Sequence, residues 1–242
     1  MNVRLRKSYM LMLPTMELWH VLNRGVDGRD IFMDDGDRAR FVHNLYEFND
    51  AAPAQSPERR LRRGDSANVR LRKSYIRERI VKIHGWVEMK SHYHLLLSEL
   101  VEGGIILFLR KLNIGYAKYF NEKHGRVGTL FQSRTKKVLV ERQAQFLYIL
   151  HYLHLNPLDY LQGAEWWRVR DKAGIGSTTE ALRYLETYRW SSYMDYVGMK
   201  NFPSLVEKDL FEGRSGEYAA DLCAYLSDAE SRVLDLGSLT LE

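Results

Sequence analysis

The chain has 242 residues, 45% of them hydrophobic, which suffices for one domain with an elaborated C-terminal part or for two small domains. Its single cysteine, Cys223, excludes an intrachain disulfide and favours a reducing compartment. No apolar run approaches the roughly 18 to 20 residues of a membrane span, and the first residues lack a signal-peptide pattern. We therefore expect a cytoplasmic protein with no membrane partner.

The net charge of +5 is unevenly distributed along the chain. From residue 205 onward, nine acidic side chains against three basic ones give −6, so the preceding residues carry +11. A basic body of this kind suits a polyphosphate partner, whereas the acidic tail does not.

Hydrophobic periodicity predicts strands and helices in a clear order. Residues 17–23 alternate as a first strand, and residues 34–49 form a helix that Asp34 or Asp35 can cap. Two further strands, 77–89 and 92–97, are followed by a helix at 105–122, a strand at 131–140 and a helix at 142–155 that Pro157 ends. This order suits an α+β fold with an antiparallel sheet and helices packed on one face.

The chain is expected to divide into three parts. Residues 1–16 form a basic N-terminal arm, residues 17–160 form the main domain, and residues 161–242 form a mainly helical C-terminal extension. Within the main domain, residues from about 51 to 75 are a basic insertion. Residues 2–9 and 68–75 are identical over eight positions, which we attribute to gene duplication or to an assembly artefact; a paired basic arm that contacts phosphates is the alternative.

The sequence Met-Lys-Ser-His-Tyr-His-Leu-Leu-Leu-Ser at residues 89–98 places His92 and His94 two residues apart in a predicted strand. Residues two apart on a strand point to the same face, so both imidazoles can bind one divalent ion from one side. Two partly buried histidines without a metal are the alternative interpretation.

The helix at 142–155 ends in Tyr-Leu-His-Leu-Asn-Pro. Tyr148, Tyr152 and Asn156 recur every four residues and therefore share one helix face. A tyrosine hydroxyl one turn from a carboxamide is a nucleophile beside a possible metal-ligating oxygen. Tyr116 and Tyr119 are two other candidate nucleophiles. Alternatively, these two tyrosines pack in the core or stack on bases.

Together these motifs resemble the single-tyrosine HUH transposases, most closely the REP-associated tyrosine transposases. Further agreement comes from Val-Leu-Asn-Arg-Gly at 21–25, Gly-Thr-Leu-Phe-Gln-Ser-Arg at 128–134 and Tyr-Arg-Trp-Ser-Ser at 188–192. The resemblance runs from about residue 19 to residue 198 and implies a ferredoxin-like core for the main domain.

The resemblance also implies a function: metal-dependent cleavage and rejoining of single-stranded DNA that carries hairpins, through a 5′-phosphotyrosine intermediate. It implies Tyr152 as the nucleophile, His92, His94 and Asn156 as ligands, and Mg²⁺ or Mn²⁺ as the metal. It allows either a monomer or a homodimer. The cations that we expect to contact DNA are Arg24, Arg59, Arg60, Arg62, Arg63, Lys118, Arg134, Lys136 and Lys137.

Two alternatives stay open. The family usually has Pro-Asn before the first histidine, whereas this chain has Lys90 and Ser91, which leaves room for a domesticated module that binds DNA hairpins without cutting them. A structural metal-binding or phosphate-binding protein of the same fold is the other.

Overall fold

A computed structural model describes residues 16–52, 77–132, 134–141, 143–162, 167, 177–211 and 217–227. The N-terminal arm up to residue 15, most of the basic insertion and both copies of the repeated octapeptide lie outside these residues. The same holds for four of the expected DNA-binding residues: Arg59, Arg60, Arg62 and Arg63.

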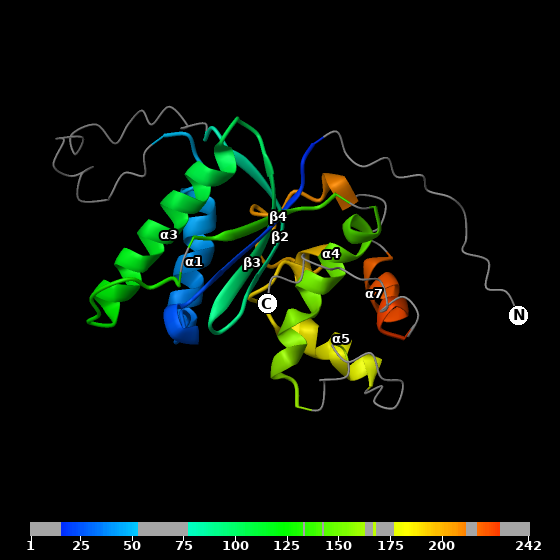
Figure 1. Ribbon diagram of the computed structural model, residues 1–242. Coiled ribbons are helices and arrows are strands. Elements are labelled where there is room, and N and C mark those ends of the chain that lie inside the picture. The colour runs from blue at the N-terminus through cyan, green and yellow to red at the C-terminus, as the bar shows by residue number, and fades with distance from the viewer. Residues whose placement is uncertain are drawn as a thin grey trace, which may run out of the picture.

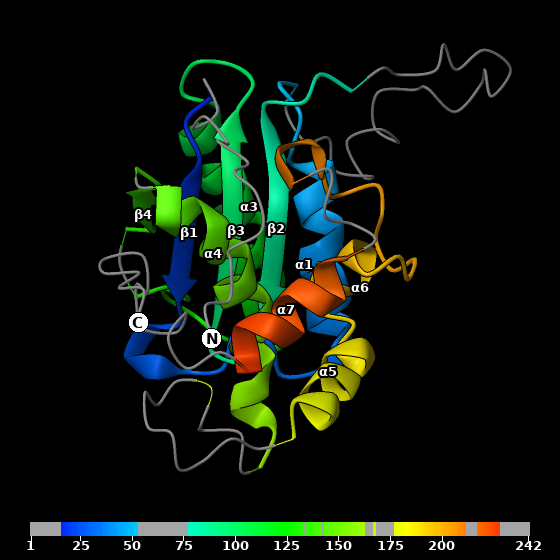
Figure 2. The same ribbon diagram turned by 90° about the vertical axis from the view of Figure 1, so that its right-hand side faces the viewer.

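A four-stranded sheet forms the centre of the molecule. Its strands are β1 (Trp19–Arg24), β2 (Val81–Glu88), β3 (His92–Glu99) and β4 (Lys136–Leu139), in the order β2-β3-β1-β4 (Figure 2). Every neighbouring pair is antiparallel. The four strands were expected from the sequence, although β4 is shorter than the expected stretch of 131–140.

Two helices complete a ferredoxin-like core. They are α1 (Asp35–Glu47), between β1 and β2, and α3 (Gly104–Lys123), between β3 and β4. Both lie against the same face of the sheet (Figure 1). Of the two aspartates that the sequence offered as caps, Asp34 caps α1 by accepting a hydrogen bond from the backbone N–H of Asp37. The α+β fold with a four-stranded antiparallel sheet is thereby confirmed.

The opposite face of the sheet is also covered by helices. On this side lie α4 (Gln143–Leu155), which contacts the sheet, and the helices of the C-terminal extension: α5 (Thr178–Thr187), α6 (Tyr193–Tyr196) and α7 (Tyr218–Ser227) (Figure 2). The short 3-10 helices are Val26–Gly28, Asn156–Tyr160 and Asp209–Phe211. The expectation of helices on one face thus holds for α1 and α3, while α4 and the extension form a third layer.

Each face of the sheet has its own hydrophobic core. The core under α1 and α3 is rich in rings, including Phe41, Tyr93 and Tyr116. The core under α4 joins Leu96 of the sheet to Leu153 and to side chains of the extension such as Leu222. The extension therefore packs on α4 rather than forming a core apart from it.

A glycine allows α4 to lie close to the sheet. A Cβ atom at Gly85 of β2 would lie 3.0 Å from Leu150 Cδ1 and 3.6 Å from Leu153 Cδ2, both on α4. The missing side chain therefore sets how near α4 comes to β2, which lies beside β3, the strand that carries the two histidines.

The C-terminal extension also covers the outer edge of β2. The backbone N–H of Glu88 donates to Trp190 O at 3.0 Å, and that of Ser192 donates to Trp86 O at 2.9 Å. Val87 and Ser191 form an isolated bridge between these bonds. Main-chain pairing of this kind protects an edge strand from pairing with other chains.

In the described part of the chain, no helix is both long and apolar enough to cross a bilayer.

Candidate active site

His92 and His94 lie on the face of β3 that α4 covers. Their ring centroids are 5.0 Å apart, with ring planes 79° apart. His94 is fully buried, and His92 is partly exposed at the start of the strand. The structure therefore places both imidazoles on one face, as the strand period predicted.

Arg24 lies beside this pair. In the register between β1 and β3, Arg24 is opposite His92 and Leu22 is opposite His94, and directly opposed residues share a face. Arg24 Nε is buried, and no atom among the described residues accepts a hydrogen bond from it. A guanidinium with an unused N–H beside two imidazoles is suited to an anionic ligand.

Tyr152 reaches the histidines from α4. Its ring centroid lies 6.0 Å from that of His94 in an edge-to-face arrangement, and Trp167 lies on another side at 6.3 Å. Tyr152 is only 5% exposed. The helix thus brings a tyrosine next to the histidine pair, although the two are almost sixty residues apart in sequence.

Asn156 follows Tyr152 by one turn and is fully buried. Its amide Nδ2 donates to Tyr152 O at 2.9 Å, where α4 gives way to the 3-10 helix Asn156–Tyr160. Pro157 is compatible with this first turn because it has no N–H to satisfy there. The bond directs Nδ2 toward the helix backbone, so Oδ1 is the atom with which Asn156 would bind a metal.

Sequence reasoning missed His20, which completes the cluster. His20 Nε2 lies 2.9 Å from His94 Nδ1, and the His20 ring centroid lies 6.0 Å from that of Tyr152. His20 is fully buried. Its alternation with Leu18 and Leu22 could have placed it on one strand face, but only the pairing of β1 with β3 shows that it meets His94.

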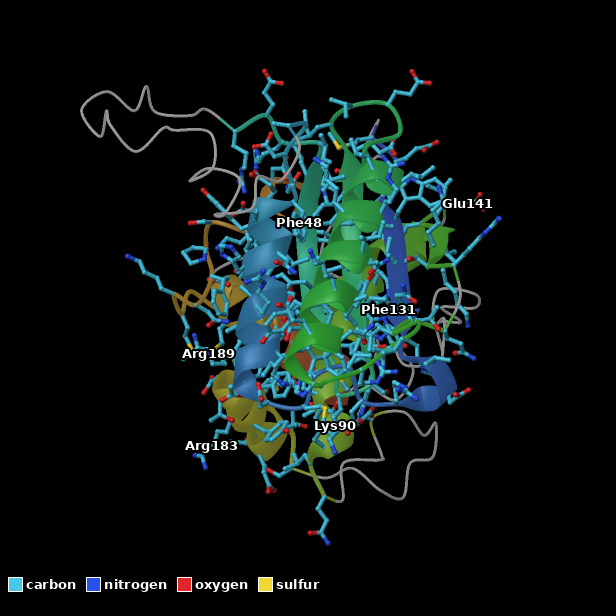
Figure 3. The ribbon with its side chains drawn as sticks, turned by 90° about the vertical axis from the view of Figure 1, so that its left-hand side faces the viewer. Phe48, Lys90, Phe131, Glu141, Arg183 and Arg189 are labelled. Atoms are coloured by element: carbon cyan, nitrogen blue, oxygen red, sulfur yellow. The ribbon has the colours of Figure 1, made fainter. Side chains whose placement is uncertain are left out.

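The residues before the histidine pair support it. Ser91 Oγ lies 3.1 Å from His92 Nδ1. The Ser91 carbonyl accepts a bond from the Gly25 N–H, and the Lys90 carbonyl accepts from the Ile31 N–H. Lys90 lies at the end of the sheet (Figure 3). A serine hydroxyl therefore contacts the first histidine of the pair.

The rival nucleophiles lie on the other face of the sheet. Tyr116 and Tyr119 belong to α3, and the Tyr116 hydroxyl donates to Ile31 O. Burial raises the pKa of Tyr116 far above its ordinary value, and it also raises that of Tyr119. Because the sheet separates them from His92 and His94, their role as core residues is the one that the structure supports.

The two histidines of α4, His151 and His154, pack against the C-terminal extension. His154 is fully buried, with Nδ1 2.7 Å from the Tyr218 hydroxyl and Nε2 2.7 Å from Ser192 Oγ. Burial lowers its pKa well below 6.5. The ring of His151 contacts Tyr218 and Tyr225 of α7.

The expected DNA-binding cations do not all lie on one face. Lys136 is opposite Leu22 in the sheet and therefore shares the face of His94. Lys137 points to the other face, where its Nζ lies 4.5 Å from the Trp19 ring centroid. Lys118 is exposed on α3, also on that face, and Arg134 is exposed just before β4.

The donor set is compatible with a metal ion. Each expected imidazole ligand has its Nδ1 within hydrogen-bonding distance of a protein atom, so each would coordinate through Nε2, which is a common arrangement of ligand histidines. Asn156 would add an amide oxygen. Within the described ranges, no three His, Cys, Asp or Glu side chains are grouped to hold a metal, so such a site depends on Asn156.

Three comparisons relate the chain to known proteins. No protein-family model and no curated protein sequence matches it. Among solved structures it is similar to a REP-associated tyrosine transposase bound to a REP hairpin, with 13% sequence identity and a TM-score of 0.44. The similarity covers 87% of this chain and 96% of that chain.

Proposed function

We propose that this protein is a metal-dependent DNA strand transferase that cleaves and rejoins single-stranded DNA carrying hairpins. The observation that supports this most is the juxtaposition of Tyr152 with His94, 6.0 Å between ring centroids, on the face that also carries His92 and Arg24. Tyr152 comes from a helix and the histidines from a strand, so their meeting is a property of the fold.

In the proposed reaction, the Tyr152 hydroxyl oxygen attacks a phosphorus atom of the DNA backbone. The new bond joins this oxygen to phosphorus, and the bond from phosphorus to the 3′ oxygen breaks. The phenol proton is lost to solvent, and the departing 3′ oxygen takes up a proton. The resulting 5′-phosphotyrosine ester conserves the bond energy, so a second 3′-hydroxyl can rejoin the strand by the reverse step.

His92, His94 and Asn156 would hold Mg²⁺ or Mn²⁺, which would supply charge neutralisation and orientation of the scissile phosphate. Arg24 would hold a phosphate oxygen beside them through its guanidinium. Lys136, on the same face of β4, would contact a neighbouring phosphate. The basic insertion with Arg59, Arg60, Arg62 and Arg63, together with Arg134, would contact more distant parts of the strand.

A covalent-adduct assay tests the proposal. Purified full-length protein is incubated with labelled single-stranded oligonucleotides that contain hairpins, with Mn²⁺ or Mg²⁺, and is run on a denaturing gel. We expect a slowly migrating adduct that EDTA abolishes and that Tyr152→Phe and His92→Ala both lack.

Tyr148→Phe is the matched control. Tyr148 lies one turn earlier on α4 and contacts Tyr225 of α7, with ring centroids 5.2 Å apart, so its loss should leave the adduct intact. An adduct that persisted in Tyr152→Phe would show that another residue is the nucleophile and would overturn the assignment.

One observation favours a second candidate function, a hairpin-binding protein that does not cut DNA. Tyr152 is 5% exposed, while His94 and Asn156 are fully buried. The Tyr152 hydroxyl oxygen is buried, so a phosphate can reach it only if neighbouring side chains move. Tight binding of hairpin DNA without any adduct, with either metal, would establish this alternative.

A further inference from the structure

His20 lies at the centre of the candidate site, yet the proposed reaction gives it no role. Its Nε2 lies 2.9 Å from His94 Nδ1, and the two ring planes are only 12° apart. The ring centroids are 5.1 Å apart, which exceeds the nitrogen–nitrogen distance by about two ring radii. The nitrogens therefore lie between the rings, and the contact is an in-plane hydrogen bond rather than a face-to-face stack.

The direction of this hydrogen bond decides whether His94 can coordinate a metal. A neutral imidazole carries its proton on one nitrogen only. If His94 donates from Nδ1–H to His20 Nε2, its own Nε2 has a lone pair for the metal. If His20 donates instead, the His94 proton is on Nε2, and that nitrogen cannot coordinate.

We propose that His20 is a positioning residue, which accepts the Nδ1–H of His94 and so holds His94 in the tautomer and ring orientation that direct Nε2 to the metal. This inference rests on the proposed metal-dependent strand transfer and deepens it. His20 acts through His94 and is not itself a ligand, since the three histidines do not form a metal-holding group among the described residues. Ser91 has the corresponding position for His92, at its Nδ1.

The tautomer can be measured in the wild-type protein without metal. Nitrogen-15 NMR of labelled histidines distinguishes a protonated from an unprotonated ring nitrogen, and His94→Gln identifies the His94 signals by their loss. We expect His94 to carry its proton on Nδ1 and His20 to carry its proton on its own Nδ1. A His94 proton found on Nε2 would overturn the proposal, and this outcome does not depend on whether a His20 variant folds.

Metal affinity provides the second test. Mn²⁺ binding to the full chain is followed by the electron paramagnetic resonance signal of the free ion, without DNA. We expect His20→Phe, which fills the space but cannot accept a hydrogen bond, to weaken Mn²⁺ binding roughly 10- to 100-fold. His20→Gln should restore most of the affinity, because its amide oxygen can occupy the position of Nε2.

The controls separate this inference from the proposed function. His154→Gln alters another buried histidine of the same layer, one that bonds Tyr218 and Ser192, and should leave Mn²⁺ binding unchanged. If His94→Ala abolishes binding but His20→Phe does not, the positioning role is wrong and the strand transferase stands. If His94→Ala also leaves binding unchanged, the metal site and the positioning role both fall.

Discussion

The two faces of the sheet are built from alternate residues of the same strands, yet they differ in chemistry. On the face under α1 and α3, Tyr93, Phe41 and Tyr116 form an aromatic core. On the face under α4, His20 and His94 stand among the apolar side chains and meet Tyr152. Successive side chains of a strand point to opposite faces of the sheet. One face can therefore carry a stabilising core while the other carries the candidate site.

The histidines show the same asymmetry. All eight lie among the described residues, and only His43 and His124 belong to the α1 and α3 side. The other six line the α4 layer: His20, His84, His92, His94, His151 and His154. The candidate site therefore lies on the side of the sheet that carries most of the histidines.

The sharpest test of the comparison exchanges two tyrosines for phenylalanine. Tyr152→Phe should lower adduct formation at least about a thousandfold, because it removes the proposed nucleophile. Tyr116→Phe should leave the adduct rate unchanged and lower the free energy of unfolding by about 1 kcal/mol, because only the bond to Ile31 O is lost. Gel assays and denaturant unfolding measure the two effects. A large loss of adduct in Tyr116→Phe would contradict the division between the faces.

Stability should depend on pH through His84 of the α4 layer. Burial is the main reason that the pKa of His84 falls from 6.5 to about 4, and its ring bonds Ser98 Oγ and Glu207 O. Between these values the unfolded chain binds a proton that the folded chain does not. Neutral, buried His84 therefore contributes to the free energy of unfolding above pH 6.5. Up to roughly 3 kcal/mol of this contribution is lost as the pH falls toward 4.

Denaturant unfolding of wild type and His84→Gln at several pH values measures this contribution. The stability difference between them should shrink as the pH falls through this window, and parallel curves would contradict the expectation.

Glu88, on the other face, should give the opposite dependence of stability on pH. Burial raises its pKa well above 4.5, so its contribution is present at low pH and is lost as the pH rises.

Gly85→Val should show whether the position of α4 affects the adduct rate beyond the effect of a general loss of stability. The added side chain would press against Leu150 and Leu153 and move α4, so we expect a loss of about 1 to 3 kcal/mol in stability and a fall of up to roughly 100-fold in adduct rate. Gly115→Ala is the control on the other face, where the new Cβ would lie 2.4 Å from Phe48 Cε2. It should also lower stability, but at temperatures where it remains folded it should react like the wild type.

The smallest expected effect concerns neighbouring lysines. Lys136→Gln should weaken binding of hairpin DNA, because Lys136 shares the face of His94. The slope of log K against log salt concentration should fall in magnitude by about 1, which corresponds to the loss of one phosphate contact. Lys137→Gln should change neither, since its amine lies over the Trp19 ring. Fluorescence anisotropy at several salt concentrations measures both. If both substitutions weakened binding equally, DNA binding would not be confined to the face of His94.

The sequence was informative where the physical signal is local. Alternation placed His92 and His94 on one face, helical spacing placed Tyr152 and Asn156 a turn apart, and Asp34 was recognisable as a cap. These features depend on a few consecutive residues.

The features that could not be predicted depend on register and on layers. His20 meets His94 only through the alignment of β1 with β3, which no local pattern encodes. Lys136 and Lys137 point to opposite faces because they are consecutive in β4, but only the register of β4 with β1 shows that Lys136 is the one on the face of His94. Helical spacing grouped Tyr152 with Asn156, but it could not show which face of the sheet α4 would cover.

The covered edge of β2 has a consequence for the order of events during synthesis. A chain leaves the ribosome from its N-terminus, and a domain generally folds as a unit. The sheet and α4 emerge first, but Ser192, which pairs with β2, and Tyr218, which bonds His154, emerge later. Until these residues have been synthesised, the side of α4 that faces away from the sheet lacks its contacts with the C-terminal extension, and the packing of α4 on the sheet is incomplete. The candidate site is therefore complete only after the helices of the C-terminal extension have been synthesised.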